Sequence, residues 1–128
     1  MWYKKIGGAA MVFKPEGMRK EIVQNMRGGK GQVEIVHLVE RNQLANEARL
    51  FARLTLKPGT SIGPHRHENE FEIFFVLSGK GTFYDNDKPT EIEAGDVCLT
   101  MSGETHSVEN NSNEDLVLLA VIILSPKS

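Results

Sequence analysis

Cysteine is nearly absent from this 128-residue chain, because Cys98 is its only one. A single thiol forms no internal disulfide and cannot complete a zinc site built on two or four cysteines. Such sparing use of cysteine is typical of a reducing compartment, so we expect a cytoplasmic protein. The length is that of a single domain.

The sequence also lacks a large excess of charge of one sign and a long apolar run. Fifteen basic and seventeen acidic side chains leave a formal charge of -2, whereas nucleic-acid-binding modules carry a clustered basic excess. The longest apolar run covers residues 116–124, about half of the length that a membrane-spanning helix needs. We therefore expect neither nucleic acid nor a membrane as a partner.

Helical patterning is also scarce, and short strand patterns take its place. Residues 42–49 form the one helical candidate, which is short and weakly patterned. Apolar patterns predict strands at 33–39, 50–56, 71–77, 82–85, 97–101, 106–109 and 116–124. Their spacing of about ten residues, with Gly, Pro and Asn between them, is typical of an all-β sandwich or barrel.

A glycine-rich stretch, residues 28–31, separates a leading segment from this series of strands. A run of glycines marks a flexible connection and a natural boundary between two parts of the chain. We expect residues 1–31 to form an N-terminal arm that packs on the barrel or on a partner subunit. Residues 32–128 would then form the barrel itself.

Two of the predicted strands, 71–77 and 116–124, are apolar on both faces. A strand with one face in water should alternate apolar with polar residues, so both faces of these strands should be covered. A second copy of the chain would supply that cover, and a two-fold homodimer is the commonest assembly. Cover by the chain's own N-terminal arm is the alternative.

Three of the four histidines fall in a pattern that indicates a metal site. His65 and His67 are two residues apart, so on a strand their rings point to the same face. Glu72 opens the next strand pattern, where a short connection would bring it beside the pair, and His106 starts another strand. Three imidazoles and a carboxylate suit one divalent first-row transition metal per chain (Mn, Fe, Zn, Ni or Co), with positions left open. An isolated histidine is more often a surface or satisfied core residue, and His37 fits that description.

The wider spacing resembles the two signature motifs of the cupin superfamily. The first motif is matched at five positions and the second at four, namely Gly59, His65, His67, Glu72 and Gly79, then Gly95, Gly103, His106 and Asn110. One departure is Met101, where the family usually has a proline that stiffens the turn before the ligand histidine. The short segment between the motifs resembles that of small single-domain prokaryotic cupins of the conserved-barrel cupin 2 type.

This resemblance implies a double-stranded β-helix, which is a jelly-roll barrel with a metal inside its mouth. The implied ligands are the same four residues, and Asn110 would be structural. Two-domain oxalate decarboxylases carry an arginine three residues before the first ligand histidine, where this chain has Ile62. The chain is thus oxalate-decarboxylase-like in its motifs but lacks a residue expected for that activity.

Three roles stay open, since a fold does not determine a function. The first is a metal-dependent enzyme acting on a small polar organic acid, sugar or aromatic, of the dioxygenase, isomerase or decarboxylase type. The second is a non-catalytic small-molecule-binding or sensor protein. The third is a metal that only stabilises the barrel. Open coordination positions favour the first over the third.

Charged and polar residues outside the motifs have two interpretations each. Arg53 shares a strand face with Phe51 and Thr55, and if that face lines the barrel it would bind a substrate carboxylate or phosphate. If the face points outward, Arg53 pairs with an acid at an interface. Arg27 and Lys30, in the glycine-rich arm, either close over the barrel mouth or belong to a solvated connection. Tyr84 is a candidate acid or base.

Overall fold

The fold is built almost entirely from antiparallel β-strands. It was obtained as a computed structural model that describes residues 3–6 and 10–126. The strands are β1 (Tyr3–Ile6), β2 (Ala10–Phe13), β3 (Arg19–Gln24), β4 (Gln32–His37), β5 (Ala48–Leu56), β6 (Ser61–Arg66), β7 (Glu70–Ser78), β8 (Lys80–Asp85), β9 (Lys88–Glu93), β10 (Val97–Thr100), β11 (Thr105–Glu109) and β12 (Leu116–Leu124). Three 3-10 turns, η1 (Pro15–Gly17), η2 (Met26–Gly28) and η3 (Arg41–Gln43), complete the described elements.

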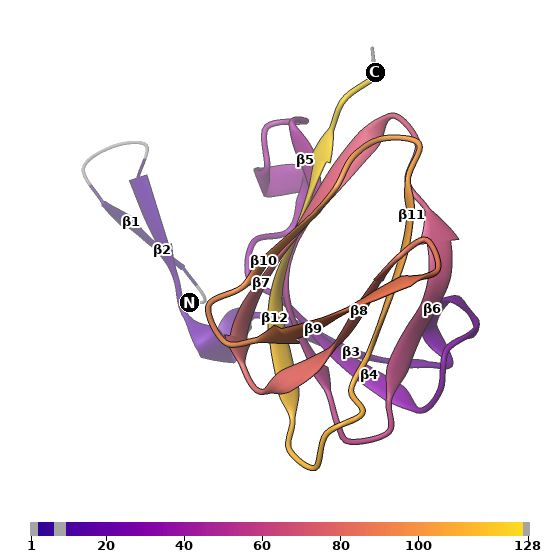
Figure 1. The fold of residues 1–128 in the computed structure, drawn as a ribbon. Coiled ribbons are helices and arrows are strands. Elements are labelled where there is room, and N and C mark those ends of the chain that lie inside the picture. The colour runs from indigo at the N-terminus through magenta and orange to yellow at the C-terminus, as the bar shows by residue number, and fades with distance from the viewer. Residues whose placement is uncertain (1–2, 7–9, 127–128) are drawn as a thin grey trace.

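Two sheets enclose the core and form the barrel (Figure 1). The six-stranded sheet has the order β10-β7-β12-β5-β4-β3, and the four-stranded sheet has the order β6-β11-β8-β9. The hairpin of β1 and β2 stands apart from both sheets. The predicted all-β jelly-roll architecture is confirmed. No helix among the described residues is long and apolar enough to span a membrane.

The predicted strands are all present, with ends that differ by a few residues, but the helix predicted at 42–49 is wrong. Only one 3-10 turn, η3, forms there, and β5 already begins at Ala48. Ala45 and Asn46 have positive φ angles of 54° and 58°, which end a right-handed helix. The segment therefore serves as the turn that leads into β5.

The list of strands predicted from the sequence lacks β1, β2, β3, β6 and β9, and of these β3 and β9 are mostly polar edge strands. β3 pairs with β4 along the rim of the six-stranded sheet, and β9 pairs with β8 at the rim of the other. Edge strands bury little surface, so their apolar pattern is weak. β3 falls within the predicted N-terminal arm, of which residues 1–2 and 7–9 lie outside the described residues.

The core lies between the sheets and is filled by alternate residues of the central strands. β5 contributes Ala52, Leu54 and Leu56, which are 0–2% exposed. The opposite face of the six-stranded sheet is open in the described chain, where Phe75 and Leu77 are 37% and 43% exposed. The two strands predicted to be covered on both faces, 71–77 and 116–124, thus pack against the core on one face only in the described chain.

Candidate metal centre

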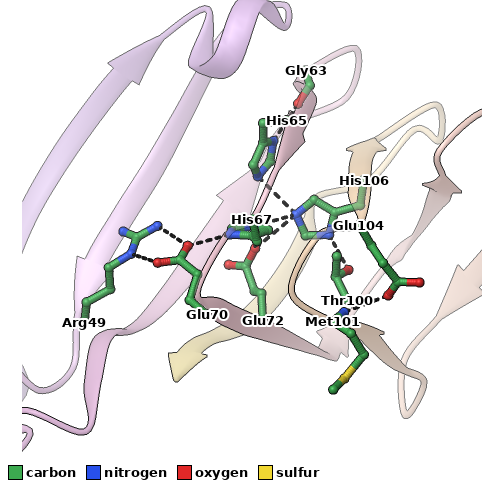
Figure 2. Close-up of polar contacts among 10 residues, drawn as sticks. All are labelled: Arg49, Gly63, His65, His67, Glu70, Glu72, Thr100, Met101, Glu104 and His106. Carbon is green, nitrogen blue, oxygen red and sulfur yellow. Dashed lines mark hydrogen bonds and ion pairs between the residues drawn. The ribbon is translucent and has the colours of Figure 1, made fainter. Parts of the chain in front are cut away.

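The four predicted ligands meet between the two sheets, at one end of the barrel (Figure 2). His65 on β6 and His106 on β11 are direct cross-strand partners in the four-stranded sheet. His67 follows β6 in the connection to β7, and Glu72 comes from β7 in the six-stranded sheet. Pairing of β6 with β11 therefore brings together two histidines that are 41 residues apart in the chain, and packing of the two sheets adds Glu72.

The four ligand atoms lie within 4.8 Å of one another, and several pairs are closer still. The Nε2 atom of His106 is 3.0 Å from Nε2 of His65 and 3.1 Å from Nε2 of His67. An oxygen of Glu72, Oε1, is 2.9 Å from His67 Nε2 and 3.1 Å from His106 Nε2. Ligands at right angles around one ion with bonds of about 2.1 Å are separated by about 3.0 Å. The observed spacing suits such an ion.

The other ring nitrogens show why these atoms need a cation. His65 Nδ1 donates to the carbonyl of Gly63 at 2.8 Å, and His67 Nδ1 donates to Glu70 at 2.6 Å. Both partners can only accept, so Nδ1 carries the proton in each ring and Nε2 of the neutral ring is a bare lone pair. Two such lone pairs and a carboxylate face one point, where they repel each other unless a positive charge joins them. This donor set fits a divalent transition metal.

Packing also fixes the ring of His106, which is only 1% exposed. Phe74 stacks on it with the ring centroids 5.2 Å apart, and Phe83 meets it edge-on at 5.6 Å. Thr100 Oγ1 lies 2.6 Å from its Nδ1. The ring has no room to rotate, so Nε2 is held in the direction of the other ligands before any metal binds.

Burial and neighbouring charges set the protonation of the ligands. Burial, together with the other two histidines and Arg27, lowers the pKa of His65 to about 4, against the opposing effect of its hydrogen bond to Gly63. Burial also acts to lower the pKa of His67, but Glu72 and Glu70 outweigh it and raise this pKa. Because a metal binds only the neutral imidazole, this raised pKa means that a proton competes with the metal for His67.

A chain of charged groups supports His67 from outside the cluster. Glu70 accepts two hydrogen bonds from Arg49, at 2.6 and 2.7 Å, and one from His67 Nδ1. Arg49, followed by His67, lowers the pKa of Glu70 to about 2. The carboxylate is therefore ionised at neutral pH and orients the imidazole for metal binding.

Replacing Glu70 with glutamine should weaken metal affinity by about 10- to 100-fold, the usual cost of losing such a supporting carboxylate. The measurement is a competition titration of the purified protein against a chelator of known affinity. Glu68→Gln is the matched control, because Glu68 lies in the same connection but pairs only with exposed Arg66. Equal affinities for the two variants would show that the Arg49–Glu70 pair does not support the site.

The turn before His106 replaces the missing proline with hydrogen bonds. Met101 N–H donates to the carboxylate of Glu104 at 2.8 Å, and Glu104 N–H donates to the carbonyl of Met101 at 3.1 Å. Gly103 N–H then donates to the carbonyl of His67, and His67 N–H donates to the carbonyl of Glu104. This turn is rigid despite Met101, and it ties the two motifs together.

A cavity of about 260 Å³ opens beside the cluster. His65, His67 and Glu72 form part of its wall. The rest is largely apolar, with residues such as Leu50, Leu54, Ile62, Phe74 and Ile122. Its other polar residues are Glu21, Arg27, His37 and Arg49. A mostly apolar pocket with a few convergent polar groups is the usual form of a small-molecule site.

Two residues considered from the sequence lie elsewhere. Arg53 is on the outer face of β5, opposite to core residues Ala52 and Leu54, and lines a separate groove with Glu34. Of the two orientations that the sequence left open for Arg53, the structure has the outward one. Tyr84 donates to Glu109 on the outside of the four-stranded sheet, so it faces away from the histidines.

Sequence reasoning missed the supporting residues Arg49, Glu70 and Thr100. Glu70 alone had a signal, because it is a carboxylate in the short connection between two predicted ligands. Arg49 and Thr100 have no such signal, since only strand pairing brings them to the site.

Cys98 is buried, which raises the pKa of its thiol to about 11 and leaves it unreactive.

Comparison with known proteins identifies the family. The family model described as a cupin domain matches residues 52–122, which hold all four ligand residues. The chain is a cupin. Over 117 residues it is 55% identical to an oxalate-binding protein from Thermotoga maritima, covering 91% of this cupin and 97% of that protein.

Two further comparisons bear on this cupin. A crystal structure of a predicted oxalate decarboxylase from Thermotoga maritima matches with a TM-score of 0.85 and 55% identity, covering 89% of this chain and 99% of that one. Auxin-binding protein 1 from Arabidopsis thaliana is 36% identical over 81 residues, which cover 56% of this chain and 40% of that protein. The fold is thus shared with a protein of nearly the same length.

Proposed function

We propose that this cupin holds one divalent first-row transition metal (Mn, Fe, Zn, Ni or Co) and uses it to bind a small carboxylic acid of the oxalate type. The observation that carries the proposal is the convergence of bare imidazole nitrogens and Glu72 on one point beside a cavity. When bound, such an ion supplies positive charge and open coordination positions for an anionic ligand. The oxalate-binding relative supports this ligand class.

Binding is favoured over catalysis by what the other acids of the cavity do. Glu21, the remaining carboxylate in the described lining, accepts from Arg19 at 2.9 Å and lies 3.6 Å from His37. Glu70, just behind the ligands, is held by Arg49 and His67. Neither carboxylate is free to deliver a proton to a bound acid. The metal-dependent enzyme that the sequence favours therefore stays a prediction. The cytoplasmic location also stays a prediction.

Metal-loaded protein should bind oxalate, and metal-free protein should not. The metal is first measured by elemental analysis of protein purified without chelator, with about one ion per chain expected. Calorimetric titration with oxalate then follows on the loaded protein and on protein stripped by chelator. Loaded protein that fails to bind oxalate contradicts the proposed ligand class. Assays for carbon dioxide, formate and oxygen uptake on the same sample test the catalytic alternative.

The predicted homodimer is also a proposal, supported by the outer face of the six-stranded sheet. Val97 and Leu99 on β10 are 62% and 55% exposed, and they lie opposite Phe75 and Ile73 of the neighbouring strand β7. Exposed apolar patches of this kind mark interfaces. Sedimentation at micromolar concentration should give the mass of two chains, and the mass of one chain would exclude the dimer.

A further inference from the structure

Arg27 is placed at the cavity by a backbone conformation that arginine rarely adopts. It lies in η2, in the connection between β3 and β4, with φ 55° and ψ 31°. A side chain in this left-handed region costs about 1 kcal/mol or more relative to glycine, and such strain concentrates at functional sites. Gly28, the next residue, also has a positive φ, of 80°, which glycine adopts without this cost. The strained residue lines the same cavity as His65.

Close packing of glycines keeps this connection against the strand that carries His65. A Cβ atom on Gly63 would lie 2.1 Å from the carbonyl oxygen of Arg27, and one on Gly29 would lie 2.1 Å from that of Ser61. Ser61 N–H also donates to the carbonyl of Lys30 at 2.9 Å. The backbone of Arg27 is therefore fixed relative to β6 and to the metal ligand on it.

The guanidinium of Arg27 forms no ion pair or hydrogen bond with the described residues, whereas Arg49 in the same cavity is fully engaged by Glu70. Arg27 shares the lining of this cavity with His65, His67 and Glu72. Ile62, at the position where oxalate decarboxylases carry an arginine, lines this cavity as an apolar residue. The cavity thus has one uncommitted cation, which comes from a different segment of the chain.

We infer that Arg27 is the residue that binds the carboxylate of the ligand, and that the site selects acids able to contact the metal and Arg27 at once. This inference rests on the proposed function. A guanidinium binds a carboxylate through paired hydrogen bonds, which fixes the ligand in one orientation. The cavity exceeds what an ion of six non-hydrogen atoms fills, so acids with a short apolar body should also fit between the walls.

The test is oxalate titration of metal-loaded Arg27→Gln. Loss of a charge-assisted contact should raise the dissociation constant for oxalate by about 10- to 100-fold. Imidazole, a neutral ligand for the metal, should bind wild type and variant with constants within about twofold. Lys30→Gln is the matched control, since Lys30 has the same charge in the same connection but lines a groove on the outer side. It should bind oxalate as wild type does.

A variant that removes the strain separates a ligand-binding role from a structural one. Arg27→Gly should retain or raise the melting temperature by a few degrees, because glycine adopts the left-handed conformation freely, and should still lose oxalate affinity. If Arg27→Gln and Lys30→Gln bind oxalate equally well, the role of Arg27 is wrong while the proposed function stands. If loaded wild type binds no oxalate, the proposed function itself fails, and this inference with it.

Discussion

His106→Ala is expected to abolish metal binding while leaving a folded barrel. Its Nε2 atom lies within 3.1 Å of three other ligand atoms, so its loss opens one side of the site and leaves the remaining donors without their cation. The loss of metal affinity should exceed the 10- to 100-fold loss that follows replacement of a supporting residue. Elemental analysis should find close to no metal in protein purified without chelator. His65→Ala should behave in the same way.

The matched control for this change is His37→Ala. His37 lines the same cavity but lies near Glu21 and contacts none of the four ligands. This variant should retain about one metal per chain, as wild type does. Metal also stabilises the folded chain, since it binds only that state. Wild type should therefore melt at a lower temperature after chelation, whereas His106→Ala should not respond to chelator. Full metal content in His106→Ala would overturn the ligand assignment.

Asn110→Ala is expected to destabilise the fold by about 2–4 kcal/mol without acting on the metal directly. Asn110 is 1% exposed and its side-chain amide donates to the carbonyls of Leu56 and Glu114 at 2.8 and 2.7 Å. Its side-chain oxygen accepts from the backbone and hydroxyl of Ser112. The alanine variant leaves the buried carbonyl of Leu56 unpaired, at about 1–3 kcal/mol, and also removes the part-buried hydrogen bonds to Glu114 and Ser112. Urea unfolding of metal-free protein measures the loss.

Asn111→Ala controls for the loss of an asparagine at this turn. The Asn111 side chain is exposed and donates one hydrogen bond, to Thr82 at 2.9 Å, so its removal should cost about 1 kcal/mol or less. Folded Asn110→Ala should still bind metal with an affinity within about twofold of wild type. Similar unfolding free energies for the two variants would mean that Asn110 is not the structural residue described above.

Asn110 also shows how far the motif could be interpreted before the structure. Its family role was expected to be structural, and it does join distant segments. Its backbone carbonyl accepts from Gly59 at 2.8 Å, so the last residue of the second motif holds the first residue of the first. The linear order of the two motifs does not reveal this contact. Spacing identifies the partners, but strand pairing is what brings them together.

Arg53 and Arg27 show the limits of inference from sequence in opposite ways. Alternation along 50–56 was reliable, but it could not say which face of the strand lies inside the barrel. The core side proved to be that of Ala52 and Leu54, so Arg53 points outward. Arg27 was one of several cations in a glycine-rich connection. Only the packing of that connection on β6 distinguishes it from Lys30.

By itself, the sequence determined the all-β class, the cupin family and the four candidate ligand residues. These depend on local patterns, namely strand alternation, glycine at turns and fixed spacing between ligands, which the chain carries in linear form. The tertiary structure decided which tautomer His65 and His67 adopt, that Arg49 and Glu70 support His67, and which cation faces the ligand cavity. Those properties depend on contacts between residues far apart in the chain. They exist only once the two sheets have packed.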